Sequence, residues 1–164
     1  MYRTVLILAL MLKFYFPSPG QDNRPQTKEE LANWTIEKVQ RIVEATDDVL
    51  SGQEPIVDTL SNEEGIRILK LWMQDNKALK LAVSEPDDSG EMRMQSAFYF
   101  SGDEMFYAAQ PFAKFIFIHG KLEYWLDNQW DPTPGTAELL DAREGFLYDE
   151  VNKYLSWIYR ADGD

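Results

Sequence analysis

The side chains most often used in catalysis are scarce in this sequence. It contains one histidine, His119, and no cysteine. Thiol chemistry and disulfide bonds are therefore excluded for this chain, and no Gly-x-Ser-x-Gly sequence supports a serine nucleophile. His119 precedes Gly120 between two apolar segments, where a tight turn is expected, and histidine tolerates a positive φ better than most residues. We interpret His119 as a turn residue rather than a catalytic base.

Carboxylates are abundant, but their spacing predicts neither an acid–base pair nor a metal site. Asp47-Asp48, Asp87-Asp88 and Asp103-Glu104 are adjacent pairs. Neighbouring residues on a helix or strand point apart, and the last two pairs lie in expected turns, so we interpret all of them as solvated acids. Residues 87–90 are similar to part of a calcium loop, but the alternating ligands and the distant glutamate of an EF-hand are missing. No metal, cofactor or enzymatic activity is predicted.

Aromatic side chains on the expected strands are the best candidates for a binding surface. We expect Trp72 opposite the aliphatic face of the first hairpin, and Trp125 on the same face as Ile116 in the last hairpin. If helices cover only the aliphatic face, the other face can take a peptide, a glycan or an apolar ligand. The candidate binding residues are Trp72, Tyr99, Trp125 and Trp130. The alternative is that charged side chains, or the loop near Trp130, cover these rings.

The elements that position these residues begin with a helix over residues 28–50. Thr27 and Glu30 have the spacing of a capping box, in which each side chain accepts the backbone N–H of the other residue. Apolar residues then recur at helical spacing, among them Ile36 and Val43. Gly52 follows, and glycine tolerates the left-handed conformation that ends many helices.

The period of apolar residues changes to two over residues 65–127, which predicts strands. A three-residue connection at residues 75–77 would pair Leu71 with Leu81 and Leu69 with Val83, so that the large aliphatic side chains share one face. The third strand is expected to carry the following residues on one side: Met92, Met94, Phe98 and Phe100.

The last expected hairpin turns at His119-Gly120, which pairs Phe117 with Leu122 and Phe115 with Tyr124. An amphipathic helix follows, over roughly residues 136–159. The predicted fold class is α+β: an antiparallel meander sheet of about six strands, flanked by an N-terminal and a C-terminal helix.

The first twenty residues indicate export. Arg3 precedes an apolar run at residues 5–12, and Ser18 and Gly20 stand three positions and one position before Gln21. This pattern is typical of a secretory signal peptide cleaved after Gly20. Lys13 interrupts the run well before the roughly 20 residues that a spanning helix needs. We expect a signal peptide at residues 1–20, a single domain at residues 21–164, no integral membrane segment after cleavage, and a periplasmic or secreted location.

The chain is strongly acidic, with a formal net charge of −12 at pH 7. Removal of Arg3 and Lys13 with the signal peptide leaves 14 basic and 28 acidic residues, a charge of −14. This charge repels phosphate backbones and anionic lipids, which bind clusters of Lys and Arg. Nucleic acid is therefore not expected as a partner, whereas a protein, peptide or glycan of the envelope is.

The sequence at residues 115–127 carries aromatic residues, a Gly-Lys-Leu turn and a Trp-Leu-Asp ending. It resembles the hairpin that ends the meander in a loose group of small exported bacterial proteins of unknown function. The resemblance implies an exported location and this fold, and it assigns no function to any residue.

We expect a non-enzymatic binding or assembly module of the bacterial envelope. The alternatives are a carrier of an apolar ligand, which needs a cavity in place of a core, and an enzyme with two acids facing each other in a pocket.

Overall fold

The computed structural model describes residue 25, residues 27–63 and residues 65–161. The expected signal peptide lies outside these residues. The chain divides into two units, Met1–Asp47 and Asp48–Asp164. In the described part of the chain, no helix has the length and apolar character needed to cross a membrane.

Helix α2 spans Lys28–Leu50, the predicted bounds. The capping box forms in both directions. Thr27 N–H donates to Glu30 Oε2 at 3.1 Å, and Glu30 N–H donates to Thr27 Oγ1 at 3.1 Å. The least exposed side chains of the helix, Ile36, Val43 and Leu50, stand seven residues apart and so lie along one stripe.

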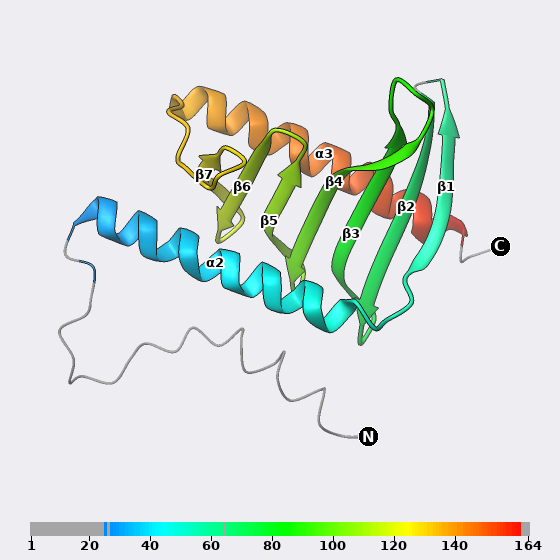
Figure 1. Cartoon of the computed structure of the whole chain (residues 1–164), viewed down its shortest axis with the longest axis horizontal. Helices are drawn as coiled ribbons and strands as arrows, with labels where there is room; N and C mark the ends of the chain where they lie inside the picture. The colour runs from blue at the N-terminus through cyan, green and yellow to red at the C-terminus, as the bar shows by residue number, and fades with distance from the viewer. Residues whose placement is uncertain (1–24, 26, 64, 162–164) are drawn as a thin grey trace. The chain divides into compact units, whose positions relative to one another are not determined.

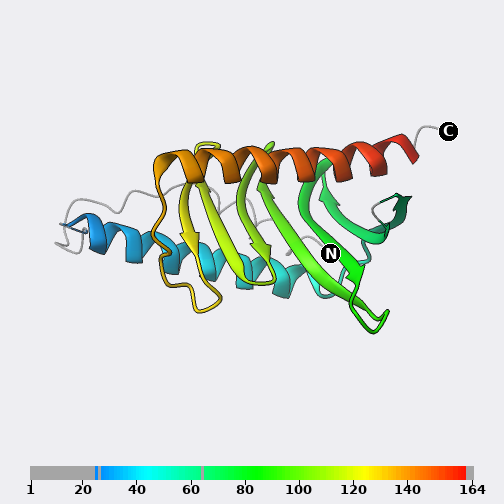
Figure 2. The ribbon, with the colours of Figure 1, turned by 90° about the horizontal axis from the view of Figure 1, so that it is seen from above.

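The second unit contains a seven-stranded antiparallel sheet and a helix along one of its faces (Figure 1). Each strand pairs with the next in sequence, in the order β1 Ile56–Asn62, β2 Gly65–Gln74, β3 Lys77–Pro86, β4 Met92–Ser101, β5 Glu104–Gln110, β6 Ala113–Ile118 and β7 Lys121–Leu126. Helix α3, Ala137–Ala161, crosses the strands (Figure 2). The α+β class and the meander are confirmed, with seven strands rather than six.

Strand β1 is the strand that the sequence pattern missed. Among the described residues it is an edge strand paired with β2 alone, and within the strand only Leu60 is buried. A strand that buries so little needs no alternation of apolar and polar residues. The two-residue period therefore becomes visible only at β2, where both Leu69 and Leu71 are buried.

The hydrophobic core lies between α3 and the aliphatic face of the sheet. Leu71 pairs with Leu81 and Leu69 with Val83, as predicted, and all four side chains are buried. Helix α3 contributes Leu147, Val151, Tyr154 and Ile158 to the same cluster. The sheet face toward α3 is therefore identified by these aliphatic pairs.

The first hairpin reaches this register through a different turn. Asp75 and Asn76 form a two-residue turn with φ of 51° and 60°, rather than part of a three-residue connection. Such primed turns match the right-handed twist of a hairpin. Leu79 is then an extra residue in a β-bulge, so that Met73 pairs with Ala78. The two turn residues and the one bulge residue together equal the three residues of the predicted connection, so Leu71 still pairs with Leu81.

The last hairpin contains a β-bulge that the pattern of apolar residues does not reveal. Phe117 pairs with Leu122, as predicted, but Phe115 pairs with Trp125 instead of Tyr124. The predicted Phe115–Tyr124 pairing is therefore wrong, because an extra residue on one strand reverses the faces beyond it.

Candidate functional site

Three of the four predicted binding residues lie on the sheet face opposite α3. Lys80 Nζ is 5.5 Å from the ring centre of Trp72 and 4.9 Å from that of Tyr99. The Tyr99 and Tyr107 ring centres are 5.4 Å apart, and Trp130 stacks on Tyr107 at 5.3 Å. The structure therefore joins Trp72, Tyr99 and Trp130 in one row of rings.

The rings in this row are largely engaged by neighbours. Tyr99 and Tyr107 are buried, and the half-buried Trp72 donates its indole N–H to the backbone oxygen of Gln53 at 3.2 Å. Lys114 Nζ lies 5.3 Å from the ring centre of Trp130. Charged side chains and the loop around Trp130 thus frame the rings, which is the arrangement of the alternative interpretation. Little aromatic surface remains for a ligand to stack on.

Trp125 lies on the α3 face, which corrects the predicted face. Its ring centre is 5.3 Å from that of Phe115, and the Arg143 guanidinium of α3 lies 4.9 Å from it. The bulge in the last hairpin turns Trp125 away from Ile116 and toward the helix. Trp125 therefore packs against the core between α3 and the sheet.

His119 is exposed in the β6–β7 turn, with a φ of 51°, which confirms its turn role.

Side chains of α3 form hydrogen bonds with the β6–β7 turn next to His119. Tyr148 donates its hydroxyl to Gly120 O at 3.1 Å, and Glu144 accepts the Leu122 N–H at 2.7 Å and Lys121 Nζ at 3.0 Å. Burial opposes ionisation of Glu144, but these donors outweigh it and hold its pKa below the ordinary value.

A polar cluster joins α3 to the other ends of the strands. Tyr154 donates its hydroxyl to Glu150 Oε1 at 3.2 Å, and Gln110 Nε2 donates to Glu150 Oε2 at 3.3 Å. Arg67 forms an ion pair with Glu85. Burial raises the pKa of Glu150, and the charge of Glu85 adds to the increase. Burial also raises the pKa of Tyr154.

This cluster is the arrangement closest to the two facing acids of the alternative enzyme. Both acids are already engaged by donors, because Arg67 pairs with Glu85 and Tyr154 bonds to Glu150. The cluster therefore acts as a polar contact between helix and sheet. Among residues 27–63 and 65–161, no group of His, Asp or Glu side chains is placed to hold a metal ion.

An exposed apolar area, which we call the corner surface, lies on the face opposite α3 at the β1–β4 end of the sheet. Its members are Val57, Ile66, Ile68, Met92 and Met94. Val57 is 57% exposed, Ile66 52%, Met92 39% and Met94 63%. The register makes the area continuous, because Ile68 pairs with Ser84 and Ser84 with Met94 across three strands.

A further bulge, in β4, hides this surface in the sequence pattern. The period of two predicts Met92 and Met94 on the same side of the strand as Phe98. In the structure Val83 pairs with Ser96 but Ser84 with Met94, so one residue of β4 is extra. Met94 therefore faces away from α3 while Phe98 lies in the core, and the predicted grouping is wrong.

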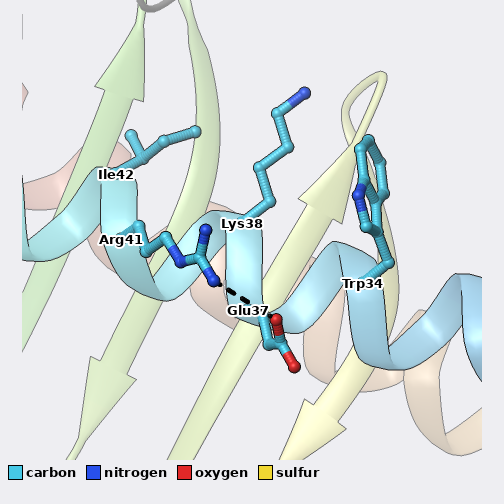
Figure 3. Close-up of a pocket in the computed structure, with 5 residues that line it drawn as sticks. All are labelled: Trp34, Glu37, Lys38, Arg41 and Ile42. Atoms are coloured by element: carbon cyan, nitrogen blue, oxygen red, sulfur yellow. Dashed lines mark hydrogen bonds and ion pairs between the residues drawn. The ribbon is translucent and has the colours of Figure 1, made fainter. Parts of the chain in front are cut away.

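Helix α2 carries a pocket of about 470 Å³, lined by Trp34, Glu37, Lys38, Arg41 and Ile42 (Figure 3). Lys38 Nζ lies 4.9 Å from the ring centre of Trp34, and the exposed Arg41 and Glu37 form an ion pair at 3.5 Å. These residues all belong to α2, and their arrangement provides no catalytic pair.

Comparisons with known proteins assign no function. The chain matches no protein-family model, no curated protein and no solved structure. Function must therefore be inferred from the corner surface and its surroundings.

Proposed function

We propose that the protein is an exported, non-enzymatic module that binds a polypeptide partner through the corner surface. The supporting observation is the exposure of four large apolar side chains, Val57, Ile66, Met92 and Met94, in one continuous area. Exposed apolar area costs about 25 cal/mol per Å², and contiguous patches of this kind mark interaction sites. Export is supported by the pattern of residues 1–20.

The chemistry of the corner surface favours a polypeptide over a glycan. Glycan recognition commonly uses open aromatic rings, but the corner surface consists of aliphatic and methionine side chains. Outside it on the same face, Tyr99 is buried and Trp72 is half-buried beneath Lys80. The flexible side chains of Met92 and Met94 instead adapt to apolar groups of varied shape. These features favour protein side chains as the contacted groups.

The structure gives less support to the other two functions. A carrier of an apolar ligand needs a cavity between α3 and the sheet, but Leu71, Phe98 and Phe115 fill that space and are fully buried. A carboxylate enzyme needs an available acid and base, but donors engage both Glu85 and Glu150.

Photocrosslinking in the cells that naturally express the protein tests the proposal. A benzophenone side chain at position 94 should give one dominant adduct with another protein. The matched control is position 103 in the β4–β5 turn, which is exposed and lies at the opposite ends of the strands. Ile66→Ser in the same chain should remove the adduct while the circular dichroism spectrum stays unchanged.

Equal adduct yields at positions 94 and 103 would contradict the proposal, because they would indicate nonspecific crosslinking rather than binding at the corner surface. Persistence of the adduct in the Ile66→Ser chain would also contradict it.

A further inference from the structure

The corner surface has the dimensions of a site for a helix. One row of paired residues crosses the four strands β1 to β4 in the order Thr59, Ile68, Ser84 and Met94. Three spacings between neighbouring strands amount to about 14 Å, which is between two and three turns of an α-helix. A sheet face is normally buried by a helix or a second sheet, and α3 already covers the opposite face in this way.

Both edges of the sheet are poorly suited to an added strand. At β1, Thr59 N–H donates to Asp58 Oδ1 at 2.7 Å, so a backbone donor is already used. Asp58 Oδ2 is buried beside it and has no hydrogen-bond partner within the described residues. A charge placed in this way is one of the devices that block edge pairing. At β7, Thr133 N–H donates to Trp125 O at 2.8 Å, and the loop thereby covers that edge.

Acidic residues flank the corner surface at the strand ends. Glu63 lies in the β1–β2 turn, and Asp87, Asp88 and Glu91 lie in the β3–β4 turn next to Met92. Arg93 pairs with Asp87 at 2.6 Å and with Glu91 at 3.2 Å, so one cation is shared between two of these acids. The turns therefore retain negative charge, which favours a partner with basic residues around its apolar face.

From this geometry we infer that the partner segment is a basic amphipathic helix, lying across β1 to β4 on the corner surface. The inference rests on the proposed function. The apolar stripe of the helix covers Ile66, Ile68 and Met94, and its Lys and Arg side chains reach the acids of the two turns. The segment belongs to another protein.

Three synthetic peptides of about 18 residues, long enough to form a helix on binding, test the inference. The first carries Leu at helical spacing and Lys elsewhere, the second replaces every Lys by Glu, and the third alternates Leu and Lys as a strand would. Fluorescence anisotropy measures their dissociation constants. The Lys helix should bind at least about tenfold more tightly than the other two at low salt, and its advantage over the Glu helix should shrink at high salt.

Two pairs of variants separate recognition from general attraction to an acidic protein. Ile66→Ser with Met94→Ser changes no charge and should weaken the Lys helix at least about tenfold. Glu63→Gln with Glu91→Gln should reduce the preference for Lys over Glu. The charge-matched control, Asp75→Asn with Asp103→Asn at the opposite strand ends, should leave that preference unchanged.

Binding of the alternating peptide as tightly as the Lys helix would overturn the inference in favour of strand addition. If the Ile66→Ser, Met94→Ser chain binds the Lys helix with unchanged affinity, binding is due to electrostatic attraction alone and the inference is overturned. A crosslinked product of two copies of this chain would identify a second copy as the occupant and also overturn it. If none of the three peptides binds but position 94 still gives a specific crosslink to another protein, only the inference of a basic helix is refuted. If position 94 gives no specific crosslink, the proposed function itself is refuted.

Discussion

Single residues show how strongly the face of a side chain depends on the local register. Leu81 points into the core between the sheet and α3, and its neighbour Lys80 points to the opposite face. Lys80 is not simply solvated there, because its Nζ lies over the rings of both Trp72 and Tyr99. The side chain therefore contributes cation–π energy in addition to charge.

Truncation of these two neighbours should have unequal effects on stability. Leu81→Ala should lower the free energy of unfolding by about 2–5 kcal/mol, the range for a leucine removed from a core. Lys80→Ala should lower it by about 1 kcal/mol, the value of a partly exposed cation–π contact. Denaturant titration of both variants measures the difference. Equal losses would show that the two faces are wrongly assigned.

At the scale of the elements, two carboxylates of α3, Glu144 and Glu150, lie at opposite ends of the strands, and their pKa values are shifted in opposite directions. Glu144 is ionised against Lys121 and the Leu122 N–H, which lower its pKa. Glu150 lies among Tyr154, Gln110 and Glu85, where burial raises its pKa. The hydrogen bond from Tyr154 and the charges of Arg67 and Lys153 lower the pKa of Glu150, but burial, together with the charge of Glu85, outweighs them. The helix therefore has one anchor that favours the charged acid and one that favours the neutral acid.

The two carboxylates should give opposite pH dependences of stability. The lowered pKa of Glu144 stabilises the fold above the ordinary value of 4.5, and this contribution is lost as the pH falls through the folded pKa. The raised pKa of Glu150 stabilises the fold below 4.5, and this contribution is lost as the pH rises through the folded pKa. Glu144→Gln should therefore lower stability at neutral pH, and Glu150→Gln should raise it.

Denaturant titrations of both variants and the unmodified chain, from about pH 4 to about pH 8, measure these effects. The two differences from the unmodified chain should both shrink toward the acidic end. A loss of stability at neutral pH in both variants would refute the assignment of Glu150.

Edge strand β1 gives a further prediction at this scale. Removal of the Asp58 carboxylate frees the Thr59 N–H and removes the charge that blocks the edge. Asp58→Ala should therefore associate through β1 at high protein concentration, which sedimentation velocity detects as dimers and larger species. The control Asp75→Ala lies in the β2–β3 turn and should remain like the unmodified chain. If the Asp58→Ala chain sediments in the same way as the unmodified chain, Asp58 does not protect the β1 edge from association.

Helix bounds and core pairs were predictable from sequence, but the faces beyond a β-bulge were not. The capping box and the apolar spacing define α2, and the aliphatic residues define the Leu71–Leu81 pairing. A bulge adds one residue without a clear signal in the period of two, and every side chain beyond it changes face. Trp125 and Met94 were therefore placed on the wrong sides, and the corner surface was missed.

At the scale of the whole molecule, an acidic chain without cysteine has to fold without disulfide bonds. A formal charge of −12 at pH 7 disfavours contact between copies of the chain and favours basic over acidic partners. Residues 1–20 contain Arg3 and Lys13 and no acid, so the predicted cleavage after Gly20 would make the net charge of the chain more negative. Export and basic-partner recognition are thus compatible in one chain.

The mature protein should begin at Gln21. The apolar run at residues 5–12 is long enough for a signal peptide, and Ser18 and Gly20 are small enough for the positions before the cleavage site. Intact mass spectrometry and N-terminal sequencing of the protein from its natural cells measure the start directly. Replacement of Gly20 by a bulky residue, as in Gly20→Trp, should block cleavage and leave the longer chain with the membrane fraction. A soluble protein that retains residues 1–20 would refute both the export proposal and the envelope partner that depends on it.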